Sequence, residues 1–511
     1  MTIEVQRFSK ALPLCALLMT VLSCSGGQKQ IVASAPTPQP TTVLTAADVQ
    51  NVVTSAAAAA NLPMVIAVSD RGGNLLGLYR KANAPTTGTG NFSQVVDSRE
   101  LALALARTAS YFSNNQAPLS SRTVRFISGI HFPPGITNAP NAALYGIENT
   151  NRGCPLNLNF APGQTLNPSR SIDGSKIGLG VITGKADVSD SDPMAVNPGG
   201  VPLFKNGVLV GGVGVVAQDN NVAEYAAFAG SVGAGLGANP APPGVVVIDG
   251  ISLPFVANTA LPAGYSAGTA DGAFDLGPVA SSGPPPEGYL VNAVAGPVGG
   301  LSQGDVTQIV TNAINTANIE RAVIRLPPGQ RAKFAIAVAD LDGSIIALYR
   351  MSDSTIFSVD VAVAKARNLA YFASQNVDPQ DMPGVPPGTA VTNRTISFGA
   401  QPLFPPGING SGPGPWFALY QYDTANPCTN GHQQANPNQS GIVFFPGSVP
   451  LYKNGKLVGA LGISGDGVEQ DDYDSAQAYV GFEPDTSIMA DQIVINNVRL
   501  PYLKFPRDPT F

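Results

Sequence analysis

The sequence is poor in charged residues and in the side chains that usually bind metals. Only 12% of the 511 residues are Asp, Glu, Lys or Arg, the net charge is −6, and there are two histidines and four cysteines. A chain without a basic surface does not neutralise a run of phosphates, so nucleic acid is not expected as a partner. The missing C-x-x-C-H motif excludes covalent c-type haem of the usual kind.

Long apolar runs are also missing, apart from one near the N-terminus. Residues 11–22 (ALPLCALLMTVL) follow Arg7 and Lys10 and are too few to span a bilayer as a helix. Residues 1–24 are therefore predicted to be a signal peptide. No later segment has the length and hydrophobicity of a transmembrane helix.

The predicted signal peptide ends in Val-Leu-Ser-Cys, which resembles a bacterial lipobox. The resemblance implies that Cys24 is acylated and anchors the protein in a membrane. An ordinary secretory signal with an incidental cysteine is the alternative. Ser25 after the cysteine favours the outer membrane, by resemblance to Gram-negative sorting rules. Residues 25–43 are rich in Pro and Thr and are expected to form an extended tether.

An internal repeat organises the rest of the chain, because six strings occur twice in the same order. The paired strings lie at 44–53 and 301–310, 64–80 and 334–350, 101–112 and 361–372, 121–136 and 393–408, 200–215 and 448–463, and 246–256 and 493–503. We therefore expect two copies of one domain, at 44–256 and 301–503. A Gly/Pro-rich linker without sustained helical or strand period is expected at 257–300, and a C-terminal tail at 504–511.

The paired strings predict the same elements in each copy. The first pair has a hydroxyl three residues before an aspartate and then apolar residues at helical spacing, which indicates a capped amphipathic helix. The second and fifth pairs predict hairpins, the latter around Asn-Gly turns at 206–207 and 454–455. The third predicts a buried helix, and the last predicts one further strand. The expected fold is α+β: in each domain a mainly antiparallel sheet with flanking helices, and the two domains packed as a pseudo-twofold pair.

The motifs of both copies resemble those of the HbpS/GlcG-like family. They are an LT-x-x-D helix, a V-x-D-x-x-G-x-L hairpin ending in Tyr-Arg, an A-x-A-K-A-R helix and a VP-x-x-x-x-G string that ends in Ser-Gly. The second copy is the closer match, because Lys365 stands where the first copy has Leu105. The resemblance implies a haem-binding or haem-degrading protein that often forms oligomers. Each copy also carries a long insertion after its FPPGI string that is not part of the family pattern.

Four residues are candidate ligands or neighbours of a haem. Axial ligands of haem iron are usually His, Cys, Met or Tyr. His131 lies in a repeated string but is replaced by Leu403 in the second copy, and His432 lies in a polar loop, so a purely structural role is an alternative for both. Tyr145 and Tyr420 recur in both copies and either flank a porphyrin or belong to the core.

Positive side chains form a second group of candidates. An arginine fork binds carboxylates, including haem propionates, through two hydrogen bonds, and the alternative is an ion pair inside the domain. The candidates are Arg80 and Arg107 in the first copy and Arg350, Lys365 and Arg367 in the second. No catalytic residue is predicted, and no metal site is assigned.

Cys154 and Cys428 occupy equivalent positions, because each follows a shared Ala-Leu-Tyr by eight or nine residues. With Cys15 removed and Cys24 acylated, they remain as an even pair in an oxidising compartment. We predict a disulfide that joins the two insertions across the pseudo-twofold axis. Two free buried thiols are the alternative.

Three classes of function remain open. The first is an exported, lipid-anchored protein that binds a small ligand, for which the family resemblance suggests haem. The second is a structural or interaction module of the cell envelope, which needs no ligand. The third is an enzyme of haem or cobalamin metabolism. A homo-oligomer or an envelope protein partner is compatible with each class.

Overall fold

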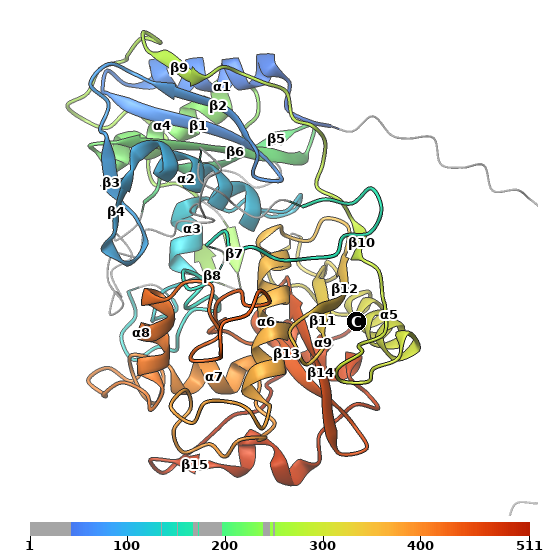
Figure 1. Cartoon of the computed structure of the whole chain (residues 1–511). Helices are drawn as coiled ribbons and strands as arrows, with labels where there is room; N and C mark the ends of the chain where they lie inside the picture. Colours follow the sequence, from blue (N-terminus) through green and yellow to red (C-terminus); the bar gives the residue numbers. More distant parts are fainter. Residues whose placement is uncertain are drawn as a thin grey trace, which may run out of the picture. The chain divides into compact units, whose positions relative to one another are not determined.

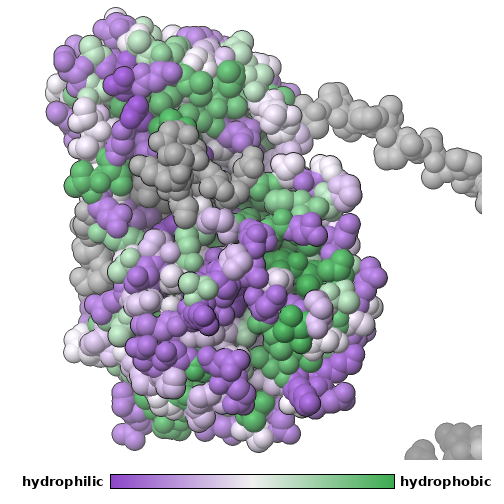
Figure 2. Space-filling model, viewed as in Figure 1, coloured by the Kyte–Doolittle hydropathy of each residue, from purple (hydrophilic) through white to green (hydrophobic). Residues whose placement is uncertain are grey.

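The computed structural model describes residues 42–133, 135–150, 152–166, 172, 197–238, 246–248, 251–325 and 327–511. The predicted signal peptide and Cys24 lie outside the described residues. Within them, no helix is both long enough and apolar enough to cross a membrane. On the face drawn in Figure 2, hydrophilic residues are interspersed with smaller groups of hydrophobic ones.

The first copy is built on a five-stranded antiparallel sheet in the order β5-β6-β1-β2-β9 (Figure 1). Its strands are β1 (Met64–Asp70), β2 (Leu75–Arg80), β5 (Gly200–Lys205), β6 (Val208–Ala217) and β9 (Ala273–Leu276). Asn206 and Gly207 join β5 to β6 with φ angles of 53° and 76°. Two positive φ angles define a type I′ turn, so the predicted hairpin is confirmed.

The second copy repeats this sheet in the order β10-β12-β11-β14-β13. Its strands are β10 (Gly288–Val291), β11 (Ala335–Ala339), β12 (Ile345–Arg350), β13 (Ser448–Lys453) and β14 (Lys456–Ser464). Asn454 and Gly455 form the equivalent turn, with φ angles of 52° and 73°. Four strands of each sheet have the same connectivity, whereas the edge strand β9 follows them in the chain and β10 precedes them. Two antiparallel sheets with flanking helices confirm the predicted α+β fold.

Helices cover both faces of each sheet (Figure 1). They are α1 (Ala46–Ala59), α4 (Asn220–Gly233) and, on the opposite face, α2 (Ser98–Phe112) in the first copy, and α5 (Gln303–Ala317), α9 (Val468–Ala478) and, opposite, α6 (Phe357–Phe372) in the second. Because side chains alternate along a strand, Ile66 packs in the core with α1 and Val65 packs against α2. Strand β1 is therefore buried on both faces. Capping boxes at Thr45 and Ser302 begin α1 and α5, as predicted.

Shorter elements lie outside the sheets. They are α3 (Ser121–Phe126), α7 (Asn393–Gly399), α8 (Phe417–Ala425), β3 (Thr87–Thr89), β4 (Val95–Asp97), β7 (Val246–Ile248), β8 (Ile251–Leu253), β15 (Val494–Ile495), β16 (Val498–Arg499) and 3₁₀ turns at Asn91–Ser93, Thr486–Ile488 and Ala490–Gln492. The last repeated string predicts one strand in each copy. It forms two short antiparallel strands instead, β7 and β8 in the first copy and β15 and β16 in the second.

Residues 257–300, predicted to be a linker without sustained helical or strand period, contain two short strands. They supply β9 to the edge of the first sheet and β10 to the edge of the second. Each strand has only four residues, too few for a recognisable alternation. The sequence predicts the partner strands β2 and β12, but no local pattern shows that this segment pairs with them. The connection between the copies is thereby part of both sheets.

Equivalent regions of the two copies face each other where the copies meet. The rings of Tyr145 and Tyr420 stack with their centroids 5.6 Å apart. The backbone N–H of Asn138 donates to Oδ1 of Asn409, and the N–H of Asn409 donates to Oδ1 of Asn138, both at 2.8 Å. Such reciprocal contacts are typical of a twofold interface, so the predicted pseudo-twofold packing is confirmed.

Cys154 and Cys428 form a disulfide, with their Cα atoms 5.6 Å apart. The predicted bridge between the two insertions is confirmed. Beyond it, residues 154–166 cross onto the second copy, where Leu156 is buried in a core cluster with α6. The Leu156 carbonyl accepts a hydrogen bond from Nη2 of Arg367 at 2.6 Å. The first insertion is thus part of the packing of the second copy.

Candidate ligand-binding site

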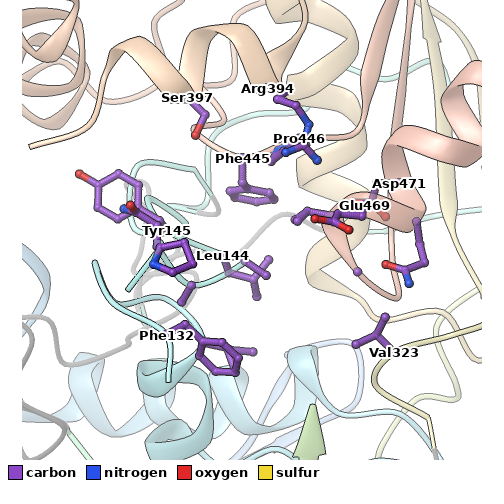
Figure 3. A pocket seen from close by; sticks show the side chains of 18 of the residues that line it. Phe132, Leu144, Tyr145, Val323, Arg394, Ser397, Phe445, Pro446, Glu469 and Asp471 are labelled. Atoms are coloured by element: carbon purple, nitrogen blue, oxygen red, sulfur yellow. The ribbon is translucent and has the colours of Figure 1, made fainter. Parts of the chain in front are cut away.

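A cavity of about 620 Å³ lies between the two copies (Figure 3). The first copy contributes the end of α2, residues 132–133 of its FPPGI string, residues 140–145 of the insertion that follows and part of the β7–β8 hairpin. The second contributes the start of α6, α7, the start of α9 and residues 444–446 and 501–506. Binding sites for small molecules and cofactors usually have volumes of about 300–1,000 Å³. The cavity therefore has the size of a ligand site, and it exists only because two copies pack together.

Most of the cavity wall is apolar and aromatic. Phe132 comes from the FPPGI string of the first copy and Leu144 from the insertion after it, while Phe357 and Phe445 come from the second copy. Phe357 stacks on Phe112 of α2 with a centroid distance of 4.2 Å and an angle of 10° between the rings. Flat aromatic surfaces of this kind favour a ligand with a large apolar face.

One wall carries charge, and the second copy supplies it. Figure 3 shows Arg394 on the opposite side of the cavity from Phe132, with Glu469 and Asp471 beside it. Arg394 is paired through Nε with Asp472, and Lys504 is paired with Glu469. These ion pairs leave the wall polar without a large net charge.

Lys365 lies directly behind this wall. Its Nζ donates to Oδ2 of Asp471 at 2.9 Å and to the carbonyl of Ile463 at 2.7 Å. Both charged side chains are almost fully buried, and Nζ lies 5.1 Å from the centre of the Phe445 ring. Burial lowers the pKa of Lys365 and raises the pKa of Asp471 to about 7. Lys365 therefore does not line the cavity but contacts two residues that do, Asp471 and Phe445.

Arg107 and Arg367 make equivalent contacts in the two copies. Nε of Arg107 donates to the carbonyl of Gly73 at 2.9 Å, and Nε of Arg367 donates to the carbonyl of Gly343 at 3.0 Å. Both glycines lie in the turns between paired strands, where their φ angles are 83° and 78°. These contacts stabilise the two turns, and neither arginine lines the cavity.

Arg80 and Arg350 contact the chain around the edge strands. Nε and Nη2 of Arg80 donate to Asp275 of β9 at 2.6 and 2.9 Å. Arg350 is buried and donates to the carbonyls of Pro286 at 3.1 Å and Ser354 at 2.5 Å. Burial lowers the pKa of Arg350 to about 9. Neither of these arginines lines the cavity either.

Tyr145 is the one predicted ligand candidate that lines the cavity, and Tyr420 lies behind it. Burial raises the pKa of Tyr145 strongly. Nδ1 of His131 hydrogen-bonds to the carbonyl of Ala139 at 2.8 Å, and neither residue lines the cavity. Nδ1 of His432 hydrogen-bonds to Asp381 at 2.6 Å, also elsewhere. Among the described lining residues, Tyr145 alone belongs to the usual axial-ligand types.

Sequence reasoning did not include Arg394 or Asp471 among the candidate ligand-binding residues. A signal for Arg394 was present, because Arg-Thr is shared by the fourth pair of repeated strings. The position of that arginine on a cavity wall depends on the packing of the two copies, which no local pattern encodes. In the described part of the chain, no group of three or more His, Cys, Asp or Glu residues is placed to hold a metal ion.

The fold and the cavity define a class of protein: a duplicated α+β domain with a ligand-sized space between its copies. A family model described as "Haem degrading protein HbpS-like" matches residues 42–230 and 312–479, and the chain belongs to this HbpS-like family. The predicted family is confirmed for both copies.

Two solved structures are similar to part of the chain. The first is Klebsiella pneumoniae protein ORFY, assigned to DUF336, with 18% identity, 35% of this chain and 86% of that chain covered, and a TM-score of 0.22. The second is the PduOC:Heme complex, with 22% identity, 36% and 97% covered, and a TM-score of 0.24. A comparison with curated proteins found no significant match.

Proposed function

We propose that this protein binds haem in the cavity between its two copies. The observation that carries the proposal is a cavity of about 620 Å³ with aromatic walls and one charged wall. Haem has the matching chemistry, because it is a flat apolar ring with carboxylates at one edge. The description of the family as haem-degrading supports the same ligand.

The lining residues fit the ring of haem better than they fit its iron. Burial of apolar surface contributes about 25 cal/mol per Å², so the stacked aromatic walls favour the macrocycle. Tyr145 would have to ionise to bind ferric iron well, and its raised pKa opposes this. We therefore expect iron-free protoporphyrin to bind within about tenfold of the affinity of hemin, a difference of about 1.4 kcal/mol.

Titration of the full chain with hemin tests the proposal. We expect a saturable change in the Soret absorbance of hemin. Ala143→Trp should abolish the change, because Ala143 is an exposed residue on the cavity wall and an indole would fill the space. Ala418→Trp is the matched control, since Ala418 is the equivalent exposed residue of the second copy and does not line the cavity. Absence of saturable binding, or equal loss in both variants, would contradict the proposal.

We also propose that the protein is exported and anchored by a lipid on Cys24 at the outer membrane. The composition of residues 1–24 supports this, and so does the Cys154–Cys428 disulfide, since structural disulfides persist mainly in oxidising compartments. The test is fractionation of cells that express the full chain. The wild type should float with outer membranes, and Cys24→Ala should be released. Recovery of the wild type in the soluble fraction would contradict the anchor.

A further inference from the structure

The same arginine–acid pair occurs in both copies, but its geometry differs. In the first copy, Nε and Nη2 of Arg122 donate to the two carboxylate oxygens of Glu224 at 2.6 and 3.0 Å. In the second copy, the equivalent Arg394 donates to Asp472 through Nε alone. Its Nη2 is buried and has no hydrogen-bond partner among the described residues. The guanidinium fork is closed in the first copy and half open in the second.

The length of the acid explains the difference. Glu224 of α4 and Asp472 of α9 are equivalent, because each follows the Asn-Gly turn of its copy at the same distance along the chain. The aspartate is one methylene shorter than the glutamate. Its carboxylate is also held by backbone N–H groups, those of Gly447 at 2.9 Å and Lys504 at 3.1 Å. Asp472 is therefore fixed where it meets only one edge of the arginine.

Leaving Nη2 of Arg394 buried without an acceptor costs free energy unless a ligand supplies the acceptor. A buried donor of a charged group without an acceptor loses the hydrogen bond that water would give it. Arg394 lines the cavity, whereas Arg122, whose fork is closed, does not. The unsatisfied donor thus occurs in the copy whose arginine faces the ligand site.

We propose that the open edge of Arg394 binds a carboxylate of the ligand, which for haem is a propionate. This inference rests on the proposed function. It adds that the carboxylate end of the ligand faces the second copy. Glu469 and Asp471 share the wall, but each is paired with its own lysine, Lys504 and Lys365. Neither acid therefore presents an uncompensated negative charge to an arriving carboxylate.

A comparison of hemin with hemin dimethyl ester on the wild-type chain tests the inference without any substitution. The ester is more apolar, so apolar contacts alone would favour it. We expect it to bind about tenfold or more weakly, because it loses a charge-assisted hydrogen bond. Equal or tighter binding of the ester would overturn the inference and leave the proposed function intact. Failure of both compounds to bind would overturn the proposed function and this inference with it.

Asp472→Glu supplies an independent test, because it introduces the longer acid that closes the fork in the first copy. We expect hemin affinity to fall about five- to tenfold while the affinity for the ester stays unchanged, which also reports an intact cavity. Glu224→Asp is the matched control in the first copy and should change neither affinity. Unchanged hemin affinity in a folded Asp472→Glu protein would overturn the inference.

Discussion

The two copies have the same core fold but differ in the charged side chains that they bury. Where the second copy buries Lys365, Asp471 and Asp474, the first has Leu105, Ala223 and Ala226 at the equivalent positions. The hairpins, turns and capped helices are nevertheless the same. The buried charges are therefore not needed for the fold. Asp471 lines the cavity, and Lys365 lies behind it and pairs with it. The pair therefore belongs to the wall of the candidate ligand site rather than to the shared fold.

The largest predicted effect comes from making the second copy resemble the first at one residue only. Lys365→Leu leaves Asp471 buried without its cation and should cost about 3–5 kcal/mol of the free energy of unfolding. The double variant Lys365→Leu/Asp471→Ala should regain most of that loss, since the first copy has an apolar pair there. Denaturation by urea at pH 8 provides the measurement. If the single and double variants lost the same free energy of unfolding, the unpaired charge of Asp471 would not be the cause of the loss, which would contradict the prediction.

The bridge between the copies gives the next largest effect. Cys154→Ser removes a disulfide that joins residues 274 positions apart and should cost about 2–4 kcal/mol. Thermal unfolding with and without a reductant measures it. The reductant should lower the Tm of the wild type and leave the variant unaffected. Alkylation of both cysteines in the unreduced wild type would contradict the bridge.

Buried acids should make the second copy sensitive to pH. Glu320 is fully buried, and burial, followed by repulsion from Asp474, Asp471 and Asp466, raises its pKa to about 11. The folded chain then keeps a proton that the unfolded chain loses above its ordinary pKa of 4.5, so the free energy of unfolding falls as pH rises between these values. Glu320→Gln should remove the contribution of this residue to the decrease in the free energy of unfolding with pH.

Thermal unfolding at pH 5, 7 and 9 tests this prediction. The Tm difference between wild type and Glu320→Gln should grow with pH by an amount on the order of a few degrees. Ala226→Ser in the first copy, at the position equivalent to Asp474, is a control that should not change the pH dependence. A Tm difference that is constant across the three pH values would contradict the prediction.

The smallest effects should be the same in both copies. Asn206 and Asn454 both have a left-handed backbone in a type I′ turn. Replacement of either asparagine by alanine should cost about 1 kcal/mol, because alanine adopts this conformation less readily. Urea denaturation of the two single variants gives the comparison. Clearly unequal costs would mean that the two hairpins contribute differently to stability despite their shared geometry.

Local chemistry made much of the fold predictable. The hydroxyl–aspartate spacing at Thr45 and Ser302 and the Asn-Gly turns specify structure within a few residues, and the duplication doubled each signal. The edge strands β9 and β10 were not predicted, because they are strands only through their pairing with β2 and β12, which lie far away in the sequence. The equivalent cysteines could be paired from sequence since their positions in the repeat match.

The candidate site was much less predictable. Tyr145 was found because it recurs in both copies, while Arg80, Arg107, Arg350 and Arg367 were candidates that the structure places away from the cavity. The half-open fork of Arg394 depends on one methylene in its acid partner and on the backbone groups that hold that acid. Such a difference is visible only when the contacts of the two copies are compared.

A crystal structure of the full chain soaked or grown with hemin tests the central claim most directly. We predict electron density for the macrocycle between Phe132, Leu144 and Phe445, with a carboxylate next to Arg394. Density for hemin at another position, such as the loop of His432, with the cavity empty would contradict the account.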